Sequence, residues 1–256
     1  MNFFQKLHMI HSAWHYRLNT EKEDICFLLK LSLKGKTVID IGANRGIYSY
    51  WMSKKAGPLG KVVAFEPQPE LETHLTGLKS AFKLDNLSIV RKGLSSEPGV
   101  MELYRAEPGS GGATLNKNLR RGTWQTVSVD VTTLDDYSDQ FRDVAFIKCD
   151  VEGHERDVFK GGRRLLERDK PCLLFECHHE EARKQALFSY LTSLGYDGFF
   201  SFKKKMIHCS RFDKFPYRRK NEHHRNYIFV HPEFIKTQGL ASLFFQGLGQ
   251  IRDQIP

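Results

Sequence analysis

The stretch TVIDIGANRGIYSY, residues 37–50, decides the fold class. Its first five residues are short, apolar and β-branched around Asp40, which is typical of a buried parallel strand. Gly42, Asn44 and Gly46 then interrupt the strand, and apolar residues at helical spacing follow. A strand, a glycine turn and a helix in this order indicate an α/β protein that receives a nucleotide-like ligand.

Apolar runs of the same kind recur along the chain and alternate with helical patterns. The buried strands are predicted at residues 37–41, 61–67, 87–93, 144–150 and 171–179. Two half-exposed antiparallel strands are predicted at 100–106 and 126–134, on either side of a glycine-rich loop at 107–115. Residues 196–202 and 226–232 are predicted to pair as a terminal hairpin. The pattern predicts an α/β, doubly wound, seven-stranded sheet with this antiparallel hairpin at its end.

Length and composition restrict the class of protein. The 256 residues contain no apolar run close to the roughly 18 that a bilayer-crossing helix needs. The first residues are interrupted by Lys6, His8 and His11, so we do not expect a secretory signal and we predict a cytoplasmic location. The five cysteines form no Cys-x-x-Cys pair, and Cys149, Cys172 and Cys177 lie in apolar strand-like runs, which indicates reduced core thiols.

Two segments near the end of the chain have unusual composition. Residues 201–225 hold nine Lys or Arg against Asp213 and Glu222. Such a basic segment indicates an anionic partner (a phosphorylated substrate, a membrane surface or nucleic acid) or a solvated loop, and the sequence leaves both open. The last residues place an apolar stripe on one helical face, at Leu240, Leu243, Phe244 and Ile251. We expect this helix to dock on the body, with a dimer or membrane contact as the alternative.

The two acids at strand ends indicate which ligand the turn holds. Asp40 ends the first strand, and Glu66 ends the second, 20 residues after Gly46. An acid at the second position accepts hydrogen bonds from ribose hydroxyls in doubly wound folds. A dinucleotide site needs Gly-x-Gly-x-x-Gly, which is missing here, and Asp40 would repel a diphosphate. The same acid suits the amino and sulfonium charges of S-adenosyl-L-methionine, so we predict this methyl donor.

Several blocks of the chain resemble the FkbM family of S-adenosylmethionine-dependent methyltransferases. They read VIDIGANRGIYS (38–49), VVAFEPQPE (62–70), SVDVTTLDDY (128–137) and FIKCDVEGHE (146–155), and GGATL (111–115) and NYIFV (226–230) fit the same pattern. The family typically has Ile where this chain has Cys149. The resemblance covers residues 35–232. It implies a class I (Rossmann-like) methyltransferase fold and O-methylation of a hydroxyl, often on a sugar of a glycolipid, an oligosaccharide or a natural product.

With the resemblance, three segments are expected: an N-terminal helical segment at 1–34, a methyltransferase domain at 35–232, and an amphipathic tail at 233–256. The predicted donor-binding residues are Asp40, Gly42, Ala43, Asn44, Gly46, Glu66, Pro67, Gly93, Leu94, Ser95 and Asp150. The predicted catalytic residues, which would orient the acceptor or take its proton, are Asp150, Glu152, His154 and His178. No metal is predicted, because Asp150, Glu176 and His178 match no metal signature. His223 and His224 are expected to be solvated.

Two other functions stay open. An RNA methyltransferase could use residues 202–220, where aromatic and basic residues interleave. The Asn/Asp-Pro-Pro-Tyr type of motif used for base methylation is absent, so nucleic acid is not the favoured partner. A non-catalytic donor-binding module is the third reading. The expected partner is a small-molecule or glycan acceptor, which could be anionic, and the sequence leaves peripheral membrane contact and homo-oligomers open.

Overall fold

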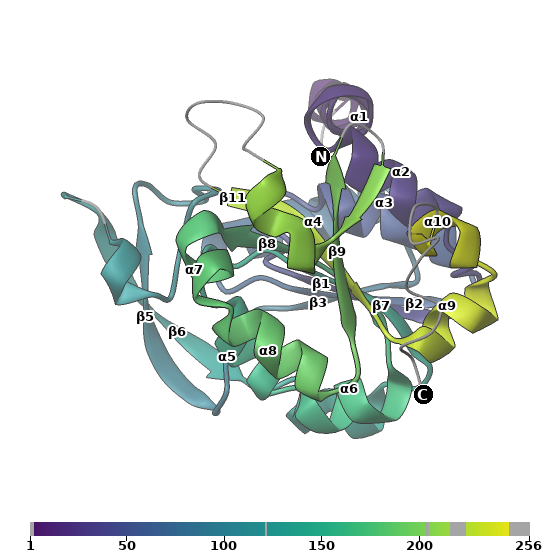
Figure 1. Ribbon diagram of the computed structural model, residues 1–256. Coiled ribbons are helices and arrows are strands. Elements are labelled where there is room, and N and C mark those ends of the chain that lie inside the picture. The colour runs from purple at the N-terminus through teal and green to yellow at the C-terminus, as the bar shows by residue number, and fades with distance from the viewer. Residues whose placement is uncertain (1–2, 121, 203–204, 216–223, 246–256) are drawn as a thin grey trace.

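The computed structural model describes residues 3–120, 122–202, 205–215 and 224–245 (Figure 1). Its centre is an eight-stranded sheet in the order β10-β9-β11-β8-β7-β1-β2-β3. The strands are β1 (Thr37–Ile41), β2 (Lys61–Phe65), β3 (Leu87–Val90), β7 (Val144–Cys149), β8 (Cys172–His178), β9 (Asp197–Phe202), β10 (Lys205–His208) and β11 (His224–Val230). The first five of these run parallel, and β11 lies antiparallel between β8 and β9.

The predicted α/β sheet and its terminal antiparallel pair are confirmed, with one correction. The sheet has eight strands within the described residues, not seven, because Lys205–His208 adds β10 to the outer edge beside β9. The sequence hides this strand inside the basic segment. Only Ile207 of the four residues is buried, so β10 shows almost none of the apolar pattern that reveals a strand.

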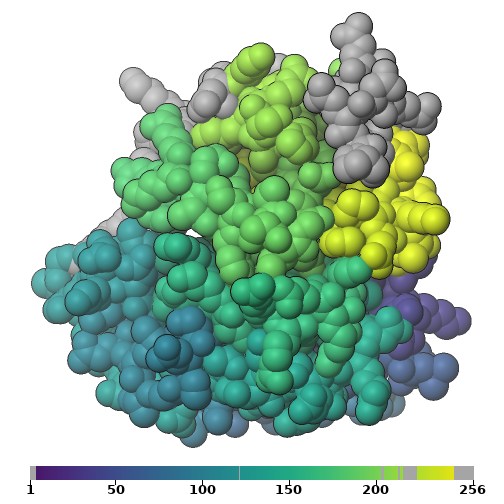
Figure 2. All heavy atoms as spheres, turned by 60° about the horizontal axis from the view of Figure 1, so that its bottom comes forward, coloured from purple at the N-terminus to yellow at the C-terminus, as the bar shows by residue number. Residues whose placement is uncertain are grey.

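Helices cover both faces of the sheet, which makes three layers (Figure 1). One face packs against α1 (Phe3–His15), α2 (Lys22–Lys30), α3 (Ile47–Ala56), α4 (Pro69–Phe82), α9 (Pro232–Gln238) and α10 (Ala241–Phe245). The other packs against α5 (Glu155–Lys160), α6 (Arg163–Asp169), α7 (His179–Lys184) and α8 (Ala186–Ser193). Figure 2 shows this second face, where residues 155–193 form a continuous green surface. Each face of the sheet has its own apolar core. Successive residues of β1 point to opposite faces: Val38 packs in the core under α1–α4, and Ile39 and Ile41 pack in the core under α5–α8.

A separate three-stranded sheet stands beside the main one. It orders β4 (Gly93–Leu94), β6 (Gln125–Thr132) and β5 (Gly99–Arg105), and β5 and β6 form the predicted antiparallel pair. Leu103, Leu115, Val129 and Val131 form its own apolar cluster. The three-stranded sheet supplies one wall of the ligand cleft described below.

Short 3₁₀ turns occur at Lys117–Leu119, Asp135–Gln140 and Cys209–Lys214, and a π-helical turn at Tyr16–Thr20 follows α1.

The C-terminal residues dock on the body as far as the structure describes them. Phe244 is buried, with its ring centroid 6.1 Å from that of Phe27 and 4.9 Å from that of Phe199. Leu240 and Leu243 pack against the same cluster, and Ile251 lies outside the described residues. None of the described helices has both the length and the apolar composition that crossing a bilayer requires. All five cysteines are free thiols, with Cys149, Cys172 and Cys177 in the core as expected.

Candidate active site

The turn after β1 depends on two glycines. Gly42 has a φ of 72°, and a Cβ there would lie 1.9 Å from the backbone oxygen of Asp150. Gly46 has a φ of 77°, and a Cβ there would lie 2.5 Å from Leu78 in α4. Both positions combine left-handed backbone with close contact, which only glycine accepts. The first contact joins the turn after β1 to the segment after β7, and the Asp150 N–H also donates to the Ile41 carbonyl at 2.9 Å.

Asp40 lies beneath this turn and does not face the cleft. Its carboxylate is buried and accepts a hydrogen bond of 2.5 Å from the Ser49 hydroxyl in α3. Burial raises the pKa of Asp40 to about 6, in spite of that hydrogen bond. The structure therefore places Asp40 where it links β1 to α3, outside the lining of the cleft.

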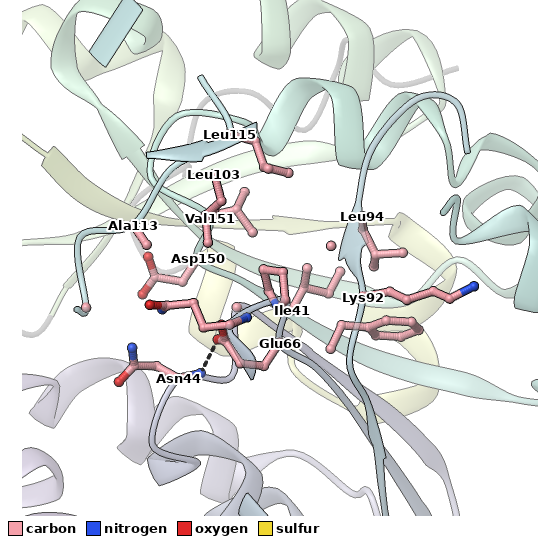
Figure 3. A pocket seen from close by; sticks show the side chains of 16 residues that line it. Ile41, Asn44, Glu66, Lys92, Leu94, Leu103, Ala113, Leu115, Asp150 and Val151 are labelled. Atoms are coloured by element: carbon pink, nitrogen blue, oxygen red, sulfur yellow. Dashed lines mark hydrogen bonds between the residues drawn. The ribbon is translucent and has the colours of Figure 1, made fainter. Parts of the chain in front are cut away.

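Glu66 lies at the end of β2 and does face the cleft (Figure 3). One carboxylate oxygen accepts the Asn44 N–H at 2.8 Å, and the other accepts the Gln68 N–H at 3.0 Å. Burial raises the pKa of Glu66, while the two backbone donors oppose that shift. Each oxygen keeps a further lone pair, so the held carboxylate can still accept two hydroxyl donors.

The cleft lies at the carboxyl edge of the parallel strands, where doubly wound folds bind ligands. It is lined by seven of the predicted donor-binding residues: Gly42, Asn44, Glu66, Pro67, Gly93, Leu94 and Asp150. The remaining lining residues are Ile41, Phe65, Gln68, Lys92, Leu103, Gly111, Ala113, Leu115 and Val151. Predicted Asp40, Ala43, Gly46 and Ser95 do not line it. The side chains of Leu94, Leu103 and Leu115 form an apolar wall of the cleft (Figure 3).

Gln68 is not among the predicted site residues, although it connects the cleft to the glycine-rich loop at 107–115. Its Nε2 donates to the Ser110 carbonyl at 3.0 Å, and its Oε1 accepts the Gly109 N–H at 3.0 Å. Farther along the same glycine-rich loop, the Thr114 hydroxyl donates to the Glu152 carbonyl at 2.7 Å. The loop is therefore tied both to the end of β2 and to the segment after β7. A glutamine after a glutamate-proline pair gives no sequence signal for such a contact.

Predicted His154 contacts predicted Ser95 instead of joining the other catalytic candidates. Its Nε2 lies 3.0 Å from the Ser95 hydroxyl, and its Nδ1 lies 3.6 Å from an Asp157 oxygen. Burial lowers the pKa of His154. The ring lines a separate surface hollow together with Asn116 and Asp157. This arrangement suits a residue that positions the segment after β7 against β4.

Three carboxylates gather beyond the cleft, at the ends of β7 and β8. One oxygen each from Asp150, Glu152 and Glu176 lies within 4.8 Å of the others. Asp150 belongs both to this carboxylate cluster and to the lining of the cleft. Strand-end placement predicts all three carboxylates at one edge of the sheet, and the register of β7 against β8 brings their oxygens together.

Each member of the carboxylate cluster has a basic side chain as its partner. Lys148 Nζ lies 3.2 Å from Asp150, His178 Nε2 lies 3.7 Å from Glu152, and His224 Nδ1 pairs with Glu176. The Glu152 contact raises the pKa of His178, and the Glu176 contact raises the pKa of His224 to about 9. His224 is thus exposed but ion-paired, whereas the sequence predicted a solvated side chain; the pairing of β11 with β8 brings it there.

The N-terminal helices close this edge of the sheet. Asn226 Nδ2 in β11 donates to Glu21 at 2.8 Å and to Asp24 at 2.9 Å. The Tyr48 hydroxyl donates to Glu21 at 3.0 Å, and its ring centroid lies 5.2 Å from Lys148 Nζ. The beginning of α2 therefore borders the carboxylate cluster.

Glu155 holds the segment after β7 and makes stability depend on pH. Its Oε1 accepts the Gly153 N–H at 3.1 Å and the Val151 N–H at 3.3 Å, and burial raises its pKa to about 7. Between its unfolded pKa and about 7 the folded state binds more protons, so raising the pH across this window destabilises the protein. We expect the melting temperature to be higher at pH 5.5 than at pH 8, and Glu155→Gln to reduce the difference by several degrees in calorimetry. Exposed Glu97→Gln is the control; an equal pH dependence in both variants would contradict the assignment.

The layers, the strand order and the cleft define a class I methyltransferase fold. Among solved structures, the chain resembles a methyltransferase FkbM from Methylobacillus flagellatus KT, with a TM-score of 0.53 and 17% identity over 76% of this chain and 43% of that chain. It also resembles a putative rRNA methylase from Clostridium thermocellum, with a TM-score of 0.52 and 10% identity over 83% and 95% of the two chains. These similarities concern the fold alone.

The family assignment follows from the sequence. The methyltransferase FkbM domain model matches residues 40–197, and the chain belongs to this family, as its motifs predicted. The hexuronic acid methyltransferase AglP of Haloferax volcanii is 29% identical over 160 residues, which cover 62% of this chain and 63% of the relative. The methyltransferase sdnD of Sordaria araneosa is 29% identical over 168 residues, which cover 54% of this chain and 64% of the relative. The chain thus spans less than two thirds of either relative's length.

Proposed function

We propose that this protein transfers a methyl group from S-adenosylmethionine to a hydroxyl oxygen of a sugar-bearing acceptor. The observation that carries the proposal is the position of Asp150. It lines the cleft that also holds Glu66, and it belongs to the carboxylate cluster beyond the cleft. A donor in the cleft and an acceptor hydroxyl at the cluster would therefore meet beside one carboxylate.

The cleft fits the donor by its chemistry. Glu66 is held by two backbone N–H groups and can accept both ribose hydroxyls, which are adjacent donors. The apolar wall of Leu94, Leu103 and Leu115 suits the faces of an adenine ring. Asp150 also lines the cleft, and its carboxylate favours the positive charge of the donor there.

When bound, the donor supplies an electrophilic methyl carbon on a sulfonium. The residues of this chain would position the acceptor oxygen in line with that carbon, which supplies much of the acceleration. The oxygen would then bond to the methyl carbon as the carbon–sulfur bond breaks, which leaves S-adenosylhomocysteine, and the hydroxyl proton would pass to a base. We assign this proton to Asp150, with the Glu152–His178 pair orienting the acceptor. His154 contacts Ser95, which supports a positioning role.

A sugar-bearing acceptor is supported by two observations. The carboxylates of the cluster and their histidine partners give several acceptors and donors on one surface, which suits a polyhydroxyl compound. AglP, the relative from Haloferax volcanii, is named for a hexuronic acid. Incubating the protein with labelled S-adenosylmethionine and a panel of glycolipids, oligosaccharides and RNA tests the proposal. We expect label on a glycan hydroxyl; label on RNA alone, or on no acceptor while donor binding persists, would contradict it.

The RNA alternative depends on the basic segment, of which residues 203–204 and 216–223 lie outside the described part of the chain. One of its basic residues faces inward: Arg225 is buried, with its guanidinium carbon 4.5 Å from the ring centroid of Phe200. Arg211 lies 5.2 Å from the ring centroid of Phe215. Arg225 is thus part of the apolar packing and unsuited to phosphate.

Replacing Glu66 by Gln is expected to raise the dissociation constant for S-adenosylmethionine about tenfold or more. The charged hydrogen-bond acceptor is lost, and the amide N–H of the new side chain would face a backbone N–H. For the wild type, donor affinity should fall as the pH falls through the raised pKa of Glu66, since only the carboxylate accepts both hydroxyls. Titration calorimetry measures both effects. Glu97→Gln, at an exposed glutamate, should bind normally. Unchanged affinity in Glu66→Gln would remove Glu66 from the donor site.

A further inference from the structure

Helix α1 and the π-helical turn after it carry an exposed apolar stripe, formed by Phe4, Leu7, Trp14 and Leu18. Their exposed fractions are 78%, 48%, 43% and 54%. Among the described residues, five of the seven exposed large apolar side chains lie between residues 4 and 18. At the α-helical rotation of about 100° per residue, the first three members fall within an arc of about 80°. The stripe is thus one face of α1, a helix at the surface of the molecule (Figure 1).

The opposite face of α1 is anchored to the body. Met9 and Ala13 are buried in the first core. The Ala13 carbonyl accepts the indole N–H of Trp51 at 3.2 Å, and the rings of Trp14 and Trp51 meet edge to face at 5.5 Å. Because the helix already has a core face, the outward stripe is a second apolar surface.

The segment that carries the stripe has basic side chains and no acidic ones. Residues 3–20 contain Lys6, Arg17 and three histidines, and they contain no Asp or Glu. The Arg17 guanidinium lies 4.7 Å from the ring centroid of Trp14 and 4.8 Å from that of Trp51. Lys6 and Arg17 are half-buried, and Lys54 of neighbouring α3 is exposed. Apolar and aromatic side chains with a basic border are the composition of helices that lie on membranes.

We propose that this face of α1 docks on the surface of an anionic lipid bilayer. Phe4, Leu7 and Leu18 would enter the boundary between headgroups and acyl chains, while Lys6 and Arg17 would bind lipid phosphates. Charge complementarity favours lipid over a second copy of the chain. In a two-fold contact the same basic border would oppose itself, and like charges across an interface repel.

Docking through the stripe would bring the carboxylate cluster close to the bilayer. The chain runs from Leu18 directly into Glu21, which accepts hydrogen bonds from Tyr48 and from Asn226 in β11. A bilayer under α1 would therefore lie on the side of the molecule where α2 borders the cluster. This arrangement suits an acceptor sugar carried on a lipid. That consequence rests on the proposed function, whereas membrane binding does not.

Vesicle flotation tests the docking with the full chain. We expect the protein to float with vesicles of phosphatidylcholine and phosphatidylglycerol, to bind phosphatidylcholine alone weakly, and to dissociate as salt is raised. The double variant Phe4→Glu and Leu7→Glu should lower the partition coefficient about tenfold or more. The matched control is Leu59→Glu with Val100→Glu, at side chains that are 85% and 68% exposed on other parts of the molecule. It makes the same change in charge and should bind as the wild type does.

Circular dichroism and donor calorimetry on both double variants separate misfolding from lost docking. Three results would overturn the proposal: wild-type protein that stays unbound to anionic vesicles, equal losses in the two double variants, or stripe-dependent dimers in sedimentation without vesicle binding. Normal donor binding together with any of these would leave the proposed methyl transfer standing. Vesicle binding without methyl transfer would leave the docking standing.

Discussion

Replacing Asp150 by Asn is expected to lower the turnover number about 10²- to 10⁴-fold, the range that a lost general base typically costs. The amide has the shape of the carboxylate, and its oxygen can still accept a hydrogen bond from the Lys148 ammonium, which lies 3.2 Å from Oδ2 of Asp150. The backbone link from Asp150 to Ile41 is also kept. Donor affinity should therefore change only severalfold, and the loss should appear in the turnover number.

Steady-state kinetics with a labelled donor, together with calorimetry, separates these two effects. Asp85→Asn is the matched control, because Asp85 is exposed in the turn before β3, at the opposite edge of the sheet. Near-normal turnover in Asp150→Asn would contradict the assigned role and would favour the Glu152–His178 pair as the base. Loss of donor binding instead would show that Asp150 holds the donor and not the acceptor proton.

Replacing Gly42 by Ala is expected to abolish measurable donor binding and to destabilise the fold. The new Cβ would lie 1.9 Å from the backbone oxygen of Asp150, so the turn after β1 or the segment after β7 must move. Both segments line the cleft, and a shift in either would displace Asn44 from Glu66. The left-handed φ of 72° adds a cost of about 1–2 kcal/mol for a residue with a side chain.

Gly35→Ala distinguishes the steric clash from the backbone strain. Gly35 has a similar φ of 77°, but a Cβ there would meet nothing within 4 Å. Chemical denaturation should show a modest loss of stability in Gly35→Ala and a larger one in Gly42→Ala. Only the second variant should lose donor binding in calorimetry. Equal behaviour of the two would mean that the contact with Asp150 does not shape the cleft.

The sequence predicts well those features that depend on neighbours in the chain. The strand from 37 to 41 and its turn are visible because a buried strand must be apolar and because left-handed backbone requires glycine. Glu66 is visible because parallel strands end at a common edge, so an acid that ends the second strand must lie near the first turn. The family blocks rest on the same local constraints.

Other parts of the site cannot be predicted from residues that are neighbours in the chain. Leu103 and Leu115 reach the cleft only because the three-stranded sheet stands against the main one. Gln68 looks like an ordinary residue before α4, yet it ties the glycine-rich loop to the end of β2. Strand-end position also suggested that Asp40, Ser95 and His154 face a ligand, whereas their side chains bind protein groups.

By itself, the sequence determined the α/β class, the glycine turn, the acid that ends β2 and the family, because each follows from backbone geometry and side-chain periodicity within a few residues. Only the tertiary structure decided that Lys148, His178 and His224 each pair with one carboxylate of the cluster. His224 is 74 residues from Asp150 along the chain, and the pairing of β11 with β8 brings it to the cluster. Electrostatic energy depends on distance in space, and the register of distant strands sets that distance.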